Sequence, residues 1–218
     1  MATPPIVVLN LKRRADRWVA WVQEAERIGL SHYTRWEAVD GKALTITPEI
    51  YQLFLSDDFD MGSGRIGCAL THMNIWHYII ENKIPALIIL EDDALLNEPL
   101  TMPDLPLGWD LFYYGGALLR KEYEPPDGPV RAAYPPGVPI NDKVLIPRFP
   151  DHMYFTTVGY MLSYSGACKL IERLKKVGFN KPVDRFMKDS FGILSVFAYR
   201  KLVVYADLNF TSDIESES

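Results

Sequence analysis

The stretch ALIILEDDA, residues 86–94, decides the fold class that the sequence predicts. Residues 86–90 would be apolar on both faces of an extended chain, which is typical of a strand in a parallel sheet covered by helices. Three carboxylates follow directly: Glu91, Asp92 and Asp93. Ligands of open parallel sheets bind beyond the carboxyl ends of the strands, so we expect these acids at a ligand site.

Strand and helix patterns alternate along the chain, as they do in α/β proteins. Apolar and β-branched runs predict strands at 5–11, 33–39, 86–91, 109–116, 155–163 and 201–208. Helical spacing of apolar residues predicts helices at 14–29, 48–55, about 66–82 and 165–178. We therefore expect an α/β fold with a mainly parallel sheet flanked by helices, in a single domain over residues 1–218.

A proline-rich region interrupts this pattern at about residues 120–150. Eight of the 16 prolines lie between Pro125 and Pro150, which predicts a loop or an irregular hairpin. Two interpretations stay open for it, a surface excursion and a mobile flap over an active site.

Composition argues against several classes of protein. A net charge of -5 and a pI near 5.4 disfavour a nucleic-acid binder. The N-terminal residues predict a strand and not a signal peptide, and no stretch approaches the roughly 18 apolar residues of a membrane-spanning helix. We expect a soluble, cytoplasmic protein. Cys68 and Cys168 are far apart, and neither lies in a metal or redox spacing, so we interpret both as reduced core residues.

The three adjacent acids need an explanation, because like charges repel by roughly 1 kcal/mol per pair at about 4 Å in water and by more where water is scarce. A divalent cation removes that cost, and Mg²⁺ or Mn²⁺ often bridges carboxylate to phosphate. The acids therefore indicate a metal–phosphate site. The alternative is a set of solvated acids at the end of a strand, with a helix-capping role.

The sequence does not support a P-loop fold or a dinucleotide-binding fold. The P-loop pattern is absent from the chain. The segment GSGRIG (62–67) matches G-x-G-x-x-G but follows a polar, acidic segment where a dinucleotide fingerprint needs an apolar strand. We interpret its glycines as allowing close approach of the chain at the start of a helix.

Seven segments, taken in order, resemble glycosyltransferase family 25, which includes bacterial lipooligosaccharide β-1,4-galactosyltransferases and collagen hydroxylysine galactosyltransferases. They are VLNLKRRADRW (8–18), WEAVDGK (36–42), GRIGCALTHMNIW (64–76), LIILEDDA (87–94), TTVGYMLSYSGACKLI (156–171), PVDRFM (182–187) and SDI (212–214). Thr71 stands where the family usually has Ser, and the resemblance is poor from about 95 to 150. The resemblance implies a GT-A-like fold, a nucleotide-sugar donor, Mn²⁺ dependence and inversion at the anomeric carbon.

The same resemblance implies roles for the acids. Asp93 is the first choice for metal ligand, since the last acid of the family's DxD-like motif usually binds the metal, and Glu91 is the second choice. Glu91 or Asp92 would otherwise face the ribose or a metal-bound water. The Mn²⁺ or Mg²⁺ would act as a Lewis acid on the charge that builds on the departing UDP.

Further donor contacts are expected at strand ends and in the first helix. Asn10 and Asp40 follow the first two predicted strands, where a uracil ring or a ribose would lie. Arg13 and Arg17 would pair with the donor phosphates or, alternatively, lie on the solvated face of the first helix.

Two more pairs of residues are donor-contact candidates. Thr71 and His72 are expected at the start of a helix, where anions are favoured, although structural hydrogen bonds would explain them equally well. Gly115 and Gly116 end a predicted strand after Tyr114, and they would let a sugar approach the backbone.

An inverting transfer also needs a base that takes the proton of the acceptor hydroxyl. Asp184 fits best, since it follows Pro182 and opens a predicted helix, with Asp151 and Asp189 as weaker alternatives. A purely structural role for Asp184, as an acid stabilised by the helix dipole, stays open. Trp18 and Trp21 are assigned to the core, and Trp76 is assigned to the core in preference to a stacking platform for a ligand.

The sequence therefore predicts an enzyme that moves a hexose, most readily galactose, from a UDP-sugar to a glycan, glycolipid or hydroxylated peptide. Its partners would be a nucleotide sugar and a carbohydrate-type acceptor. Two other functions stay open: a catalytically silent binding module with this fold, and a metal-dependent hydrolase of nucleotide sugars. The intact acidic triplet favours an active enzyme over the silent module.

Overall fold

The computed structural model describes residues 3–54, 62–116, 137–147 and 156–207 of the 218-residue chain. Its centre is an eight-stranded sheet in the order β2-β1-β3-β8-β5-β9-β7-β6. The strands are β1 (Ile6–Asn10), β2 (Thr34–Glu37), β3 (Ala86–Glu91), β5 (Leu111–Tyr113), β6 (Gly137–Pro139), β7 (Val144–Pro147), β8 (Gly159–Ser163) and β9 (Val196–Tyr199). A separate two-stranded sheet pairs β4 (Ala94–Leu96) with β10 (Val204–Ala206).

Six of the eight central strands share one direction, and only β8 and β7 run against them. The predicted α/β class, with a mainly parallel sheet flanked by helices, is therefore confirmed. Strand β8 pairs antiparallel with both β3 and β5. The chain thus enters β8 at the edge of the sheet where β3 ends.

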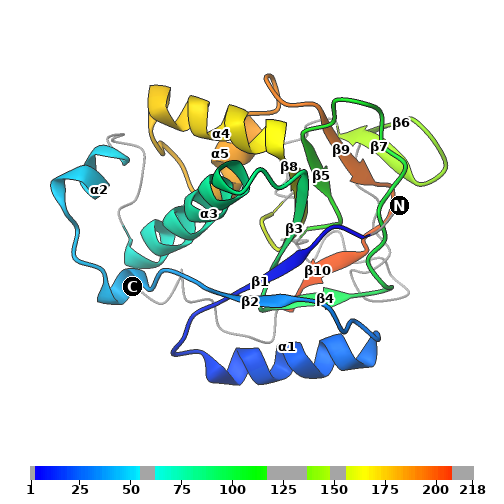
Figure 1. Cartoon of the computed structure of the whole chain (residues 1–218), viewed down its shortest axis with the longest axis horizontal. Coiled ribbons are helices and arrows are strands. Elements are labelled where there is room, and N and C mark those ends of the chain that lie inside the picture. The colour runs from blue at the N-terminus through cyan, green and yellow to red at the C-terminus, as the bar shows by residue number, and fades with distance from the viewer. Residues whose placement is uncertain (1–2, 55–61, 117–136, 148–155, 208–218) are drawn as a thin grey trace, which may run out of the picture.

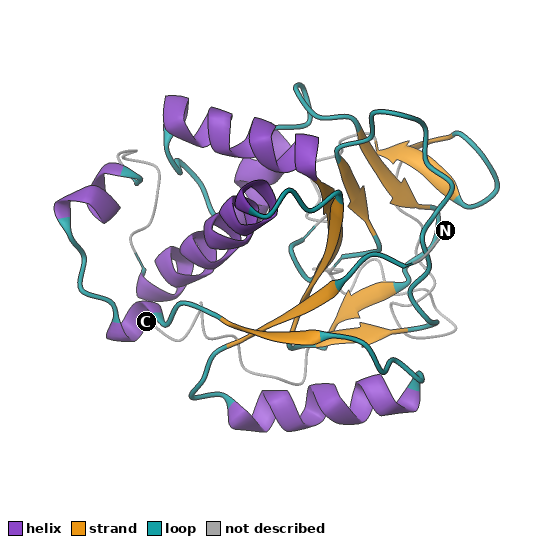
Figure 2. Cartoon of the chain, viewed as in Figure 1, coloured by secondary structure: helices purple, strands orange, loops and turns teal. Residues whose placement is uncertain are grey.

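Helices cover both faces of the sheet (Figures 1 and 2). They are α1 (Ala15–Arg27), the 3₁₀ helix η1 (Gly41–Ala43), α2 (Pro48–Gln52), α3 (Ser63–Glu81), α4 (Tyr164–Val177) and α5 (Val183–Asp189). On β3, Leu87 and Ile89 face the core under α3, α4 and α5, whereas Ile88 and Leu90 face the core under α1. Burial on both faces explains why ALIILE is continuously apolar.

Several predicted boundaries are confirmed by the chemistry that marks them. Gly29 lies just beyond α1 with φ 72°, and Gly178 caps α4 with φ 62°, a conformation that glycine adopts at little cost. Ser163 caps the other end of α4 by accepting a hydrogen bond from the Gly166 backbone N–H at 3.0 Å.

Other predicted elements differ from the structure. Helix α3 begins at Ser63 and not near residue 66, and the strand predicted at 109–116 is reduced to Leu111–Tyr113. The strand predicted at 201–208 becomes β10, which pairs with β4 outside the central sheet. The strands missing from the prediction are β4, β6, β7 and β9, all of three or four residues.

Part of the proline-rich region is a hairpin at one edge of the sheet. Strands β6 and β7 pair antiparallel, and Asn141 Oδ1 closes their turn by accepting from the backbone N–H groups of Lys143 and Val144 at 2.9 and 2.8 Å. The predicted flap would involve residues 117–136 and 148–155, which lie outside the described residues. Within the described ranges, no helix has the length and apolar character needed to cross a membrane.

Gly67, the last glycine of the segment 62–67, does allow close approach of the chain, as predicted. A Cβ on Gly67 would lie 2.5 Å from the carbonyl oxygen of Val39, and a Cβ on Gly41 would lie 1.7 Å from that of Ser63. The turn after β2 therefore packs directly against the first turns of α3. This contact brings the carboxyl end of β2 beside α3.

We expect Gly41→Ala to lower the free energy of unfolding by roughly 1–3 kcal/mol or more, because the added methyl group has to displace backbone atoms. Urea denaturation would measure the change. Gly192→Ala is the matched control, since a Cβ at exposed Gly192 meets no atom within 4 Å. Equal stability of the two variants would contradict the tight contact between η1 and α3.

Candidate functional site

A cavity lies at the carboxyl ends of β1 and β3, bordered by the start of α1, the turn after β2 and helix α3. Most of the residues predicted from the sequence surround it. They are Arg13, Arg17, Asp40, Thr71, His72, Glu91, Asp92 and Asp93. The structure thus brings together side chains that are up to 80 residues apart in the sequence.

Arg17, in the first turns of α1, is the buried cation of this cavity. Its Nη2 atom lies 2.5 Å from Asp92 Oδ1 and 2.8 Å from Asp93 Oδ2. Burial lowers the pKa of Arg17, but the charges of Asp93, Asp92 and Glu91 outweigh burial and raise it. Arg17 therefore stays charged and does not lie on the solvated face of the helix.

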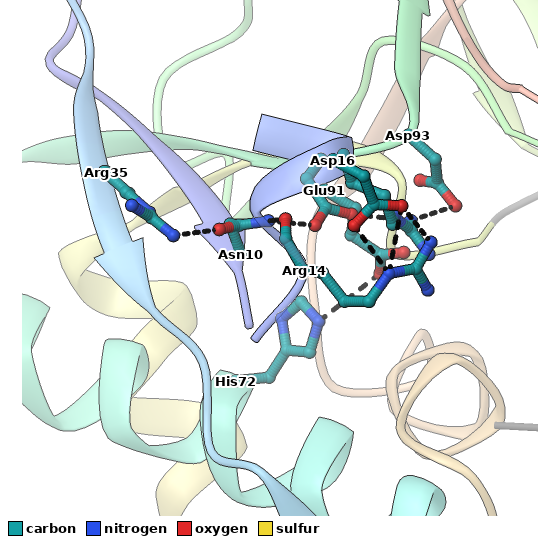
Figure 3. A network of polar contacts seen from close by, with 9 residues as sticks. Asn10, Arg14, Asp16, Arg35, His72, Glu91 and Asp93 are labelled. Carbon is teal, nitrogen blue, oxygen red and sulfur yellow. Dashed lines mark hydrogen bonds and ion pairs between the residues drawn. The ribbon is translucent and has the colours of Figure 1, made fainter. Parts of the chain in front are cut away.

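Asn10, at the end of β1, is buried and holds Asp92 from the other side. Its side-chain amide donates to Asp92 Oδ2 and, at 3.0 Å, to the backbone carbonyl of Arg14. Its own oxygen accepts from Arg35 on β2 (Figure 3). Asp92 is thus engaged on both oxygens, so Asn10 and Asp92 act together as a support for the neighbouring acids.

Asp93 and Glu91 each keep an oxygen available. Asp93 Oδ1 and Glu91 Oε1 are buried and have no hydrogen-bond partner among the residues that the structure describes. Burial and the Glu91 charge raise the pKa of Asp93 to about 7, although Arg17 opposes them. Burial also raises the pKa of Glu91, but the His72 and Thr157 side chains and Arg17 lower it by more. One buried arginine therefore does not neutralise the three acids.

Arg13 and Asp40 form the outer rim of the cavity. Arg13 Nε lies 2.7 Å from Asp40 Oδ2, and the two side chains are 37% and 26% exposed. Asp40 Oδ1 also accepts from the Lys42 backbone N–H and caps η1. Asp40 follows β2, as predicted, whereas Arg13 lies in the turn before α1 and not in the first helix.

Thr71 and His72 line the cavity, but their expected place at the start of a helix is wrong. Helix α3 begins at Ser63, so both residues lie in its interior. Thr71 Oγ1 donates to the Gly67 carbonyl at 2.7 Å and accepts from the Val39 backbone N–H at 2.9 Å, which fastens the turn after β2 to α3. Neither residue is therefore near a helix N-terminus, and the helix dipole does not favour an anion beside them.

His72 is completely buried and points from α3 toward the acids (Figure 3). Its Nδ1 atom lies 2.7 Å from the Tyr160 hydroxyl, to which the Trp76 indole N–H also donates at 3.3 Å. Its Nε2 atom faces Glu91 Oε1 at 3.6 Å. Trp76 is in the core, as predicted, and it supports the Tyr160–His72 contact from behind.

Gly115 and Gly116 do not line the cavity, in contrast to their predicted donor contact. Both are buried, and a Cβ on Gly115 would lie 1.7 Å from the carbonyl oxygen of Val204 on β10. Position 115 therefore requires a glycine because strand β10 packs against it, and not because a sugar approaches it. Tyr114 is likewise buried and donates to the Thr101 carbonyl.

A sequence model described as "Glycosyltransferase family 25 (LPS biosynthesis protein)" matches residues 3–124, more than half of the chain. The chain belongs to glycosyltransferase family 25. The match includes β1, α3 and β3, which carry the cavity.

Curated relatives of this family 25 chain include animal proteins. A "Glycosyltransferase 25 family member" of Drosophila melanogaster is 30% identical over 84% of this chain and 30% of its own length. "Procollagen galactosyltransferase 1" of Danio rerio is 28% identical over 100% of this chain and 39% of its own length. "Procollagen galactosyltransferase 2" of Homo sapiens is 29% identical over 95% and 33%. The chain spans about a third of the length of these relatives.

Two solved structures are similar at low identity. A glycosyltransferase involved in the glycosylation of the major capsid of PBCV-1 aligns with a TM-score of 0.47 and 9% identity, over 96% of this chain and 95% of that chain. An active-site mutant of LgtC aligns with a TM-score of 0.48 and 11% identity, over 98% and 92%.

Asp184 lies in the first turn of α5 in the family 25 chain, as predicted, but outside the lining of the cavity. Burial raises the pKa of Asp184, and the negative charge of Glu91 raises it further. Hydrogen bonds from the backbone N–H groups of Asp184 and Arg185, together with the Arg185 charge, lower it by less. Asp184 is thus within electrostatic range of the acids. Of the alternatives, Asp189 is exposed and pairs with Lys181 at 2.9 Å, and Asp151 lies outside the described residues.

Cys68 is the cavity residue that the sequence interpretation missed. It is free and packs against the core from a half-buried position, as predicted, but it also lines the cavity. Cys168 is also free and half-buried, on α4. Trp21 is in the core as predicted, but Trp18 is only partly buried and packs under the Arg35 guanidinium at 4.8 Å.

The raised pKa of Asp93 predicts a pH dependence of stability. Between pH 4 and 7 Asp93 is protonated in the folded protein and ionised in the unfolded chain. The free energy of unfolding therefore falls as pH rises, by roughly 1.4 kcal/mol per pH unit at most. Asp93→Asn removes this loss, so its stability relative to wild type should increase from pH 5 to pH 8. Urea denaturation of metal-free protein would measure it.

The matched control is Asp189→Asn, which removes one exposed, paired carboxylate. Its stability relative to wild type should change little over the same range. A constant difference between Asp93→Asn and wild type at all pH values would contradict the raised pKa.

Proposed function

We propose that this family 25 chain is a metal-assisted, inverting glycosyltransferase. It would move a hexose, galactose in the first instance, from a UDP-sugar to a hydroxyl group of a glycan, glycolipid or hydroxylated peptide. The observation that carries the proposal is the pair of available carboxylate oxygens, Asp93 Oδ1 and Glu91 Oε1, in a cavity that Arg13 and Arg17 also line. The names of the curated relatives support galactose as the first sugar to test.

The residues present fit a divalent cation. Both available atoms are carboxylate oxygens, the hard ligands that Mn²⁺ and Mg²⁺ prefer. Asp93 and Glu91 would hold the ion, whereas Asp92 is engaged by Asn10 and Arg17. A bound cation supplies charge stabilisation to the diphosphate leaving group without a proton transfer.

The protein's own residues would orient the donor. Arg13 is partly exposed at the rim and is placed to face an anionic ligand entering the cavity. Arg17 fixes the orientation of Asp92 and Asp93 and keeps their positions when the cavity is filled. Preorganised charges of this kind cost no rearrangement during the reaction.

Asp184 is the proposed base. A base works best when its pKa is not far below the working pH, and burial together with the Glu91 charge raises the pKa of Asp184. Asp184 comes from α5, on a different element from the acids on β3, so it would approach the acceptor from another side than the metal.

Calorimetric titration with UDP and UDP-sugars tests donor binding. We expect wild type to bind UDP more tightly with Mn²⁺ than without, and Asp93→Asn to lose at least tenfold of the metal-dependent affinity, because one ligand oxygen becomes an amide. Asp189→Asn serves as the control. No UDP binding at any Mn²⁺ concentration would reject the transferase and leave the silent module.

Product analysis with an acceptor panel tests the chemistry. Asp184→Asn should keep UDP binding and reduce kcat by about 10²–10⁴-fold, since a missing general base acts on the chemical step. Transfer product from wild type would support the proposal. Release of free hexose at the same rate with and without every acceptor would indicate the hydrolase instead.

A further inference from the structure

A second group of ligand atoms lies in the cavity beside Asp93. It consists of Cys68 Sγ, an imidazole nitrogen of His72 and a carboxylate oxygen of Glu91, all within 4.8 Å of one another. Cys68 and His72 are four residues apart on α3, so both project from one face of the helix. Glu91 approaches them from the end of β3.

The geometry points to a site for a borderline-soft divalent cation, Zn²⁺ by preference, ligated by Cys68, His72 and Glu91. Ligand atoms around a tetrahedral Zn²⁺ are about 3.5 Å apart, given Zn–S and Zn–N bonds of about 2.3 and 2.0 Å. Small side-chain rotations would close the observed separations to that value. Thiolate and imidazole together favour Zn²⁺ over Mn²⁺ and Mg²⁺, which separates this site in chemistry from the carboxylate site of Asp93.

The first support is an unsatisfied nitrogen. His72 is fully buried, and its Nε2 atom and Glu91 Oε1 face only each other, with no other hydrogen-bond partner for either atom among the described residues. The 3.6 Å between these two atoms is too long for a hydrogen bond and is close to a ligand–ligand distance around a metal. Such orphaned polar atoms are costly in a protein interior unless something binds them.

The second support is the contact behind His72. In the tautomer in which Nδ1 donates to the Tyr160 hydroxyl, at 2.7 Å, Nε2 presents its lone pair to Glu91 and Cys68. A second hydrogen bond of this kind fixes the orientation of most histidine ligands. Trp76 holds Tyr160 in turn, so the imidazole is positioned before any metal arrives.

The third support is access. The Glu91 side chain is 28% exposed and Cys68 is half-buried, so the group opens into the cavity. Catalytic zinc sites have three protein ligands and a fourth position open to water or substrate, whereas structural zinc sites have four protein ligands. Binding would release the Cys68 thiol proton to solvent as the sulfur–metal bond forms. Glu91 Oε1 would then bridge the Zn²⁺ and the donor-side cation proposed above, which Asp93 Oδ1 also binds.

Cobalt(II) titration of the metal-free 218-residue chain, under argon with a thiol-free reductant, tests the site. We expect a thiolate-to-cobalt charge-transfer band that saturates at one equivalent and that Zn²⁺, but not Mn²⁺ or Mg²⁺, abolishes. The chain has only two cysteines, so the assignment is direct. Cys68→Ser should lose the band, and the matched control Cys168→Ser should keep it.

The imidazole is tested by Tyr160→Phe, which removes only the hydroxyl group behind His72. We expect about 10- to 100-fold weaker cobalt binding with the band retained, in a variant whose fold is checked by circular dichroism. Unchanged affinity would reject the positioning role of the Tyr160 hydroxyl, and an unchanged band in His72→Ala would reject His72 as a ligand. A missing band in wild type, or a band that survives Cys68→Ser, would overturn the proposal.

The outcome is separable from that of the proposed function. Mn²⁺-dependent UDP binding with no cobalt–thiolate band would reject this site and leave the transferase. The band without any UDP binding would establish the metal site and reject the transferase.

Discussion

The guanidinium group of Arg17 carries the electrostatic constraint on which the rest of the site depends. It is buried between Asp92 and Asp93, and it ties the first turns of α1 to the end of β3. Removing one partner from a buried ion pair costs about 3–5 kcal/mol, because the remaining charge is left without compensation. Asn10 completes the arrangement from β1, so three neighbouring elements meet at one carboxylate, Asp92. The remaining negative charge, on Asp93 and Glu91, faces the cavity, and the three acids at the edge of the core are thereby explained.

The parts of the fold that local chemistry determines could be predicted from the sequence. The run ALIILE is buried on both faces, and Gly29 and Gly178 end their helices through positive φ angles. The direction of β8 could not be predicted, because period-two patterns are the same in parallel and antiparallel strands. Strand β9 is four residues long, and its burial comes from neighbours that are distant in the sequence. The role of Gly115 could not be predicted either, because strand β10, which packs against it, is almost 90 residues away in the sequence.

The sequence could predict which residues at the ends of strands line the cavity. It could predict the cavity residues inside helices much less well. Asn10, Asp40 and the three acids lie at strand ends, which parallel-sheet topology brings to one edge. The place of His72 depended on where α3 begins, and the polar residues before Ser63 gave no clear start signal. Cys68 was missed because its spacing was compared with that of the other cysteine. The informative partner was His72, one helical turn away, and Glu91 joins them only through the tertiary fold.

The antiparallel direction of β8 affects how this family can vary. Because β8 begins where β3 ends, the chain enters it beside the acids, and the Val158 carbonyl accepts from the Glu91 backbone N–H at 3.0 Å. Substitutions at Thr157, whose side chain interacts with Glu91, would therefore change what lies beside the acids, while the pairing of β8 with β3 and β5 keeps its register. The surroundings of the acids can therefore vary at this one junction while the scaffold of the sheet stays the same.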